Sequence, residues 1–347
     1  MEKIIKAAVE RGASDLHIKA GDVFRARING KLVPLTKQRL TPDQTRAIAL
    51  KLLPGDDARS RLDLTKDFDC SWGMPGVGRF RVNLLRQRSS FMIVMRVIPF
   101  TVPSLEELGL PAAVQTLAEA EQGLVIVAGV TGSGKTSTVA AMVNHINQNL
   151  HRHILTIEDP IEFLHRDVKC SVTQREVGVD TDNFAVGLQA ALRQDPDVVV
   201  ISELRDGETL ETAIRAVETG HLVITAMPTA DVMTTIARLH SMFPAPEREV
   251  GRLRLSESLR GVVAQRLLPR KDESGRIPVI DLMVGNPAVK ACLRDADRLD
   301  DLEDEIEGGD DGMQTFAQHA GRMVKAGDIS KDTAQVVIGG KGRKAER

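Results

Sequence analysis

Residues 129–136, with the sequence GVTGSGKT, constrain the fold of this chain more than any other segment. They match the pattern G-x-x-x-x-G-K-[ST] at every fixed position. The apolar segment GLVIVAG leads into them, and the helix-like segment GKTSTVAAMVNHINQN continues from them. This order predicts a strand, a glycine loop and a helix. Glycines allow backbone N–H groups to wrap a phosphate, and the helix N-terminus adds a positive dipole end.

The loop predicts binding of ATP together with Mg²⁺. We expect Lys135 to reach the β- and γ-phosphates and the Thr136 hydroxyl to ligate the metal ion. The predicted nucleotide contacts of this segment are Gly129, Val130, Thr131, Gly132, Ser133, Gly134, Lys135, Thr136 and Ser137.

Acidic residues end two of the later apolar segments. Glu203 ends DVVVISE, which places it at the carboxyl edge of a parallel sheet near the phosphate loop, where an acid can orient water. A surface acid at a strand end is the alternative. In TIEDPIE, Glu158, Asp159 and Glu162 could hold Mg²⁺ through water. A turn at Asp159-Pro160 with solvated acids is the other interpretation, and the residues leave both open.

The hydrophobic pattern changes along the chain. Continuous apolar strands alternate with helices in the middle of the chain, which predicts an α/β fold whose mostly parallel sheet is covered on both faces. The N-terminal part has the pattern of a smaller α+β domain with a hairpin turn at Asn29-Gly30. The predicted boundaries are 1–98 for the N-terminal domain, 99–111 for a proline-bounded linker, 112–285 for the α/β domain, 286–331 for a helical segment and 332–347 for a disordered tail.

Composition argues against several classes of protein. A formal net charge of −2 and an aromatic content of 3% argue against nucleic acid as a partner. The three cysteines are far apart and form no pair suited to a zinc site. The chain has no apolar run of membrane-spanning length, and its first residues lack the apolar core of a signal peptide. We therefore expect a cytoplasmic protein, or one held at a membrane by partners, with no direct membrane insertion.

Four segments occur in a characteristic order and spacing: GVTGSGKTST, TIEDPIEF, ALRQDPDVVVISELRD and AVETGHLVITA. They resemble the Walker A, Asp, Walker B and His boxes of the secretion ATPase superfamily. The segments GASDLHI, GRFRVN, SESLRGVVAQRLLPR and GMQTF further resemble the PilT group of type IV pilus retraction ATPases. The resemblance extends over about residues 3–330.

This resemblance implies a RecA-like P-loop NTPase domain with a PAS-like N-terminal domain, assembled as a homo-hexamer. The implied function is to couple ATP hydrolysis to type IV pilus retraction, in which pilin is disassembled and twitching motility results. The implied partners are an inner-membrane pilus platform protein and a PilT-like paralogue. The chain would then be cytoplasmic and peripheral at the inner membrane.

The matching motifs also imply roles for single residues. Glu203 would be the general base, Lys135 a further catalytic residue and His221 the first His-box residue. Glu162 would be an Asp-box acid near Mg²⁺, with Glu158 as a further metal candidate. The N-terminal domain would bring arginines toward the nucleotide phosphates, at Arg79, Arg81 and Arg96.

Two positions depart from the pattern of this family. Ser202 precedes Glu203 where the family usually has glycine, and Pro228 stands where it usually has a second histidine. Proline neither donates a hydrogen bond nor titrates, whereas imidazole does both. These departures motivate the alternative of a weakly hydrolysing accessory subunit that acts with an active paralogue. A further alternative is a pilus-extension or type II secretion ATPase.

Overall fold

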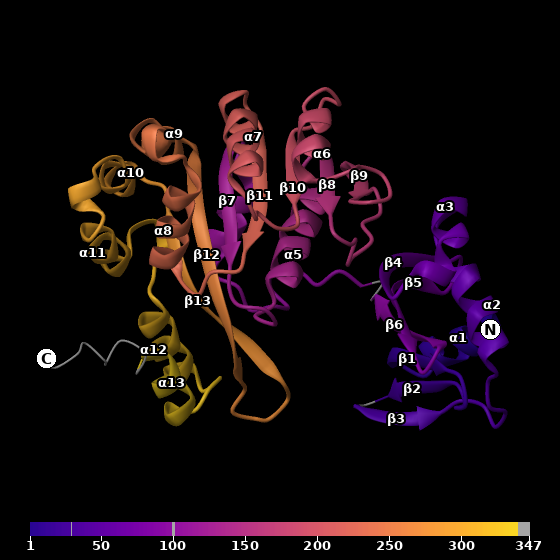
Figure 1. Cartoon of the computed structure of the whole chain (residues 1–347). Coiled ribbons are helices and arrows are strands. Elements are labelled where there is room, and N and C mark those ends of the chain that lie inside the picture. Colours follow the sequence, from indigo (N-terminus) through magenta and orange to yellow (C-terminus); the bar gives the residue numbers. More distant parts are fainter. Residues whose placement is uncertain (29, 99–100, 339–347) are drawn as a thin grey trace, which may run out of the picture. The chain divides into compact units, whose positions relative to one another are not determined.

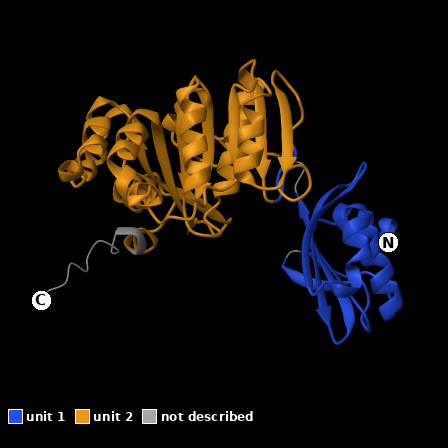
Figure 2. Ribbon diagram, turned by 45° about the horizontal axis from the view of Figure 1, so that its top comes forward, with its two compact units in different colours: residues 1–101, 160–164 blue, residues 102–159, 165–347 orange. Residues whose placement is uncertain are grey.

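The computed structural model describes residues 1–28, 30–98 and 101–338. The chain divides into two compact units, one formed by residues 1–101 with 160–164 and the other by residues 102–159 with 165–347 (Figure 2). Residues 160–164 thus belong to the first unit, although the sequence boundaries placed them inside the α/β domain.

The first unit is an α+β structure (Figure 1). Its elements are α1 (Glu2–Glu10), β1 (Ala13–Lys19), β2 (Arg25–Ile28), β3 (Lys31–Pro34), α2 (Pro42–Leu52), α3 (Gly55–Ser60), the short helix η1 (Leu62–Leu64), β4 (Asp67–Met74), β5 (Gly78–Gln87) and β6 (Ser90–Ile98). Its described strands form a six-stranded antiparallel sheet in the order β3-β2-β1-β6-β5-β4.

Local sequence explains these elements. Alternation in β5 buries Phe80, Val82 and Leu84 on one face of the sheet. The helix α2 begins with a capping box, in which the Thr41 hydroxyl accepts the Gln44 N–H and the Gln44 side chain accepts the Thr41 N–H. In the predicted hairpin, Ile28 of β2 lies opposite Lys31 of β3, and Asn29 falls outside the described residues.

The second unit has strands alternating with helices. Its elements are α4 (Ala112–Glu119), β7 (Gly123–Ala128), α5 (Lys135–Asn149), β8 (His153–Glu158), β9 (Ser171–Glu176), α6 (Phe184–Ala191), β10 (Val198–Ile201), α7 (Gly207–Glu218), β11 (Leu222–Met227), α8 (Val232–Met242), η2 (Ala245–Glu247), α9 (Arg248–Ser258), β12 (Leu259–Pro269), β13 (Arg276–Val284), α10 (Pro287–Arg294), η3 (Ala296–Arg298), α11 (Asp301–Gly308), η4 (Asp310–Gly312), α12 (Phe316–Ala326) and α13 (Lys331–Ile338).

The sheet of this unit has the order β13-β12-β7-β11-β10-β8-β9 among the described strands (Figure 1). Its neighbours pair in parallel except for β12 and β13. Alternate residues of β7 enter different cores: Leu124 and Ile126 pack with α6, α7 and α8, whereas Val125 and Val127 pack with α4 and α5. The expected α/β fold with a sheet covered on both faces is confirmed.

Two features differ from the sequence expectations. Strand β9 extends the sheet at its edge, although its polar sequence SVTQRE has no apolar run that would predict a buried strand. Helix α13 occupies residues 331–338, where the disordered tail was expected to begin, and residues 339–347 lie outside the described part. Among the helices that the structure describes, none has both the length and the apolar character needed to cross a bilayer.

His319 on α12 is held in its neutral form by the fold. Its Nδ1 accepts the backbone N–H of Ile280 on β13 at 2.9 Å, and burial lowers the pKa of its imidazole to about 4, from an ordinary value of 6.5. An unfolded chain therefore binds this proton at a higher pH than the folded chain. The stability that His319 contributes is complete above pH 6.5 and is lost as the pH falls toward 4.

We predict that His319→Asn flattens the acid side of the stability profile, because the amide oxygen still accepts the Ile280 N–H and does not titrate. The free energy of unfolding, measured by chemical denaturation between pH 4 and 6.5, should fall less in this variant than in the wild type. The control is His151→Asn at an exposed histidine. Parallel profiles for His319→Asn and the wild type would contradict the assignment.

Candidate active site

The phosphate-loop segment joins the end of β7 to the start of α5. It is tied to the neighbouring strand β11 because the Gly129 N–H donates to the Met227 carbonyl at 3.1 Å. Gly132 and Gly134 have φ values of 81° and 90°, a region that side chains disfavour. The loop therefore has the tight backbone path that the motif predicted.

Gly129 is required by close packing. A Cβ at this position would lie 2.2 Å from Ser133 Oγ and 2.7 Å from the backbone oxygen of Gln265. The second atom belongs to β12 and cannot move without distorting the sheet. The space beside Gly129 thus admits backbone alone, as a loop that closes around phosphate oxygens requires.

Gln265 fixes the loop from β12 and was not predicted from the sequence. Its side chain is 1% exposed. Its Nε2 donates to the Ser133 carbonyl at 2.7 Å, and its Oε1 accepts the Thr138 hydroxyl at 2.8 Å. One side chain thereby joins the loop to the first turn of α5. The available signal was a polar residue inside the apolar segment VVAQRLL.

The reactive groups of the loop lie at its open side. The Lys135 ammonium donates to the carbonyls of Gly129 and Val130 at 2.6 Å and 3.2 Å, which holds its charge at the loop. Thr136 is exposed on the first turn of α5. The helix N-terminus, the ammonium group and the hydroxyl form a donor set suited to a magnesium-bound triphosphate.

Glu203 lies just beyond β10, next to the end of β8. Its Oε2 accepts from Arg205 Nε at 2.8 Å, and Arg205 Nη1 donates to Asp159 Oδ2 at 3.2 Å. The Ser202 hydroxyl accepts the Asp159 N–H at 3.2 Å. Ser202, the first departure from the family pattern, thus links the two strand ends, which a glycine at this position cannot do through a side chain.

The two other acids predicted for metal binding have local partners. Glu158 Oε1 accepts from Thr156 Oγ1 at 2.6 Å and from Gln174 Nε2 at 2.9 Å. Glu162 belongs to the first unit, where its carboxylate lies 3.9 Å from an Arg81 nitrogen. Across the described ranges, the structure gathers no group of three or more His, Cys, Asp and Glu side chains that could hold a metal ion.

His221 lies at the opposite edge of the sheet from the phosphate loop. It precedes β11, and its carbonyl accepts the N–H of Gly123 at the start of β7. At about 3.3 Å per residue, the six-residue strand separates it from the loop edge by roughly 20 Å. Its Nδ1 lies 2.8 Å from the Ala216 carbonyl oxygen. His221 thus lies away from the phosphate loop of its own chain, and the catalytic role implied for it as the first His-box residue stays a prediction.

Pro228, in contrast, follows β11 at the same edge as the phosphate loop. It is exposed and lines a cavity of about 510 Å³ together with Val130 of the loop, Leu204 and Arg205. The remaining lining residues are Met227, Thr229, Ala230, Thr234 and Arg238. The second departure from the family pattern thus lies beside the phosphate-loop segment.

The three predicted arginines lie on adjacent strands of the first unit. Arg81 of β5 is the register partner of Arg96 of β6, and Arg79 lies two residues before Arg81. Arg96 Nε donates to Asp15 Oδ1 at 3.0 Å. Their approach to nucleotide phosphates stays a prediction.

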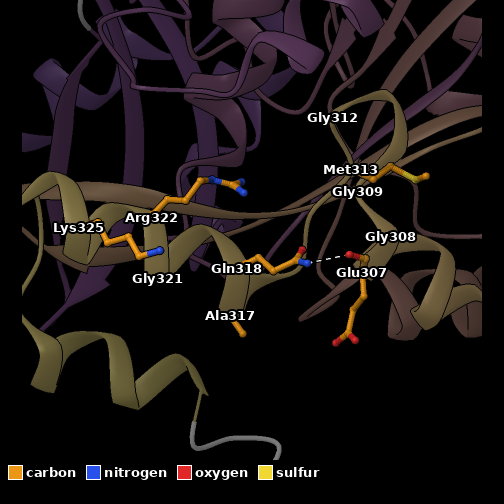
Figure 3. Close-up of a pocket in the computed structure, with 10 residues that line it drawn as sticks. All are labelled: Glu307, Gly308, Gly309, Gly312, Met313, Ala317, Gln318, Gly321, Arg322 and Lys325. Carbon is orange, nitrogen blue, oxygen red and sulfur yellow. Dashed lines mark hydrogen bonds between the residues drawn. The ribbon is translucent and has the colours of Figure 1, made fainter.

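Among the further hollows of the second unit are two that border α5 and α12. One, of about 300 Å³, flanks the start of α5, with Ser137, Arg270 and Arg276 among its lining residues. The other, of about 610 Å³, is formed by the end of α11, η4 and α12 (Figure 3). Gln318 crosses it by donating to the Glu307 carbonyl at 2.8 Å (Figure 3). No predicted site residue lines this second hollow, so it is separate from the candidate active site.

Comparisons with known proteins agree with this geometry. The model of the Type II/IV secretion system protein family matches residues 1–299. The type IV pilus ATPase PilU of Pseudomonas aeruginosa is 38% identical, over 96% of this chain and 87% of that protein. The retraction ATPase PilT of the same organism is 39% identical, over 96% of both chains. A crystal structure of the pilus retraction motor PilT with bound ADP has a TM-score of 0.89, with 41% identity over 96% of both chains.

We predict that Gly129→Ala lowers nucleotide affinity at least about tenfold, because the added methyl overlaps fixed β12 backbone and overpacking of this kind costs ~1–3 kcal/mol. Equilibrium binding of a fluorescent ADP analogue measures the change. The matched control is Gly321→Ala, where a Cβ would meet no described atom within 4 Å. Wild-type affinity in Gly129→Ala would show that the loop path is not fixed by this contact.

Proposed function

The chain belongs to the Type II/IV secretion system protein family, among the PilT and PilU type IV pilus ATPases, and we propose that it is a motor that couples ATP hydrolysis to type IV pilus retraction. The observation that carries the proposal is the meeting of the phosphate loop, Lys135 and Glu203 at one edge of the sheet of the second unit. The 96% coverage by the retraction ATPase PilT supports the direction of the motor.

Each of the residues at this edge of the sheet has a separate role in ATP hydrolysis. The loop N–H groups and Lys135 would bind the β- and γ-phosphates, and Thr136 would hold Mg²⁺, which would neutralise phosphate charge. Glu203 accepts a proton from the attacking water. The water oxygen then bonds to the γ-phosphorus, the bond to the β–γ bridging oxygen breaks, and ADP and phosphate leave.

The relatives also support a proposal for the assembly, the partners and the location of the ATPase. We infer a homo-hexamer that acts on an inner-membrane pilus platform protein and works beside a PilT-like paralogue. The motor would be cytoplasmic and peripheral to the inner membrane, because its relatives act in pilus machinery. Arg79, Arg81 and Arg96 are proposed to contact nucleotide phosphates within this assembly.

A second candidate function is a weakly hydrolysing accessory subunit. The observation in its favour is Pro228, which lines the cavity beside Val130 and offers no hydrogen-bond donor or titratable group. The sequence identities to PilT and PilU are similar, at 39% and 38%, so they do not favour one of the two candidate functions over the other.

We predict that Lys135→Ala and Glu203→Gln each lower ATP turnover by roughly 10²–10⁴-fold, the range for removal of a positioned acid–base or phosphate-stabilising group. Phosphate release is measured with Mg²⁺, and nucleotide binding is measured in parallel. Glu203→Gln should still bind nucleotide. The control is Glu121→Gln, at an exposed acid just before β7. Wild-type protein that binds ATP and releases no phosphate would refute the motor.

We predict that Pro228→His raises turnover about tenfold if the chain is a weak hydrolase, because one added hydrogen bond to a charged group is worth that factor. Pro228→Ala is the control, since it removes the ring and adds no donor. Equal rates in the wild type and both variants would mean that this position does not limit the reaction.

A further inference from the structure

Arg205 joins the two acids that flank the reaction site. It spans Glu203 and Asp159 with separate nitrogens, at 2.8 Å and 3.2 Å. Its guanidinium also lies 5.5 Å from the centre of the Phe184 ring. The hydrogen bond to Glu203 is the main reason that the pKa of Arg205 is raised, so the guanidinium stays charged over the whole pH range in which proteins fold.

This pairing opposes the proposed role of Glu203. A general base must present its oxygen to water, and a carboxylate oxygen that accepts from a guanidinium is partly occupied. Glu203 is 28% exposed in its side chain and Arg205 is 50% exposed, so the pair is accessible to a ligand and is not a buried structural bridge.

Arg205 also borders the space next to the phosphate loop. It lines the same cavity as Val130 of the loop and Pro228. The neighbouring Pro228 side chain has no group that could bind a phosphate. The guanidinium of Arg205, in contrast, can bind phosphate oxygens through paired N–H groups. A terminal phosphate in this cavity would compete with Glu203 and Asp159 for the same N–H groups.

We propose that Arg205 is a positioning residue that responds to the terminal phosphate of ATP. Arg205 holds Glu203 and Asp159 when that phosphate is absent and binds the phosphate when it is present. The carboxylate of Glu203 is then free to accept a proton from water. This inference rests on the proposed hydrolysis of ATP. It assigns to Arg205 the discrimination between a nucleoside triphosphate and a diphosphate.

Arg238 provides a matched control. It lines the same cavity from α8, and in the part of the chain that the structure describes its guanidinium has no hydrogen-bond or ion-pair partner. Substitution of Arg238 therefore removes equal charge from the cavity and leaves the contacts of Glu203 and Asp159 unchanged.

The test compares binding of ADP with binding of a non-hydrolysable ATP analogue, both with Mg²⁺, to the full chain. We expect the wild type to prefer the triphosphate, and Arg238→Ala to reduce that preference less than Arg205→Ala does. Arg205→Ala should lose roughly tenfold to a hundredfold of that preference, the range for a hydrogen bond to a charged group. Arg205→Lys, which keeps the charge and cannot span two acids, should lose part of it.

Three outcomes decide the matter. An unchanged preference in Arg205→Ala overturns the inference, and so does equal binding of both nucleotides by the wild type. If the triphosphate preference depends on Arg205 but the wild type releases no phosphate from ATP, the result supports the inference and refutes the motor. Thermal unfolding of each variant is followed with nucleotide absent, and Arg205→Lys carries the test if Arg205→Ala does not fold.

Discussion

The contact between Gln265 and the phosphate-loop segment is the constraint on which the rest of the site depends. A buried amide that donates to the Ser133 carbonyl and accepts from Thr138 leaves neither partner without a hydrogen bond. The loop is therefore anchored from β12, while the Met227 carbonyl of β11 anchors it by accepting the Gly129 N–H. With both anchors in place, the first turn of α5 and the ends of β8 and β10 share one edge of the sheet, so that charged groups can act on one ligand.

Much of this arrangement could be predicted from the sequence. Continuous apolar strands, the glycine loop and Glu203 at a strand end indicated the parallel sheet and its active edge. Strand direction also follows from this pattern: His221, before a parallel strand, lies at the amino edge of the sheet, whereas Pro228, after the strand, lies at the carboxyl edge. Gln265 was missed because its partners are more than a hundred positions away in the chain.

The two departures from the family pattern have different physical meanings. Ser202 adds a hydroxyl that accepts an N–H from the neighbouring strand end, so it strengthens the connection between β8 and β10. Pro228 adds no polar group and lies beside the loop. A substitution can thus be judged by whether its new atoms find partners, which requires the spatial neighbours that only the fold supplies.

The boundary between the two units falls beside the contacts of Arg205. The chain enters the first unit a second time for residues 160–164, immediately after Asp159. Asp159 bonds to Arg205, which bonds to Glu203, so a single peptide bond separates the first unit from a chain of contacts that ends at the proposed base. Asp159 is thus both the last residue of the second unit before this segment and a direct partner of Arg205, so the contacts of Arg205 begin where the chain passes from one unit to the other.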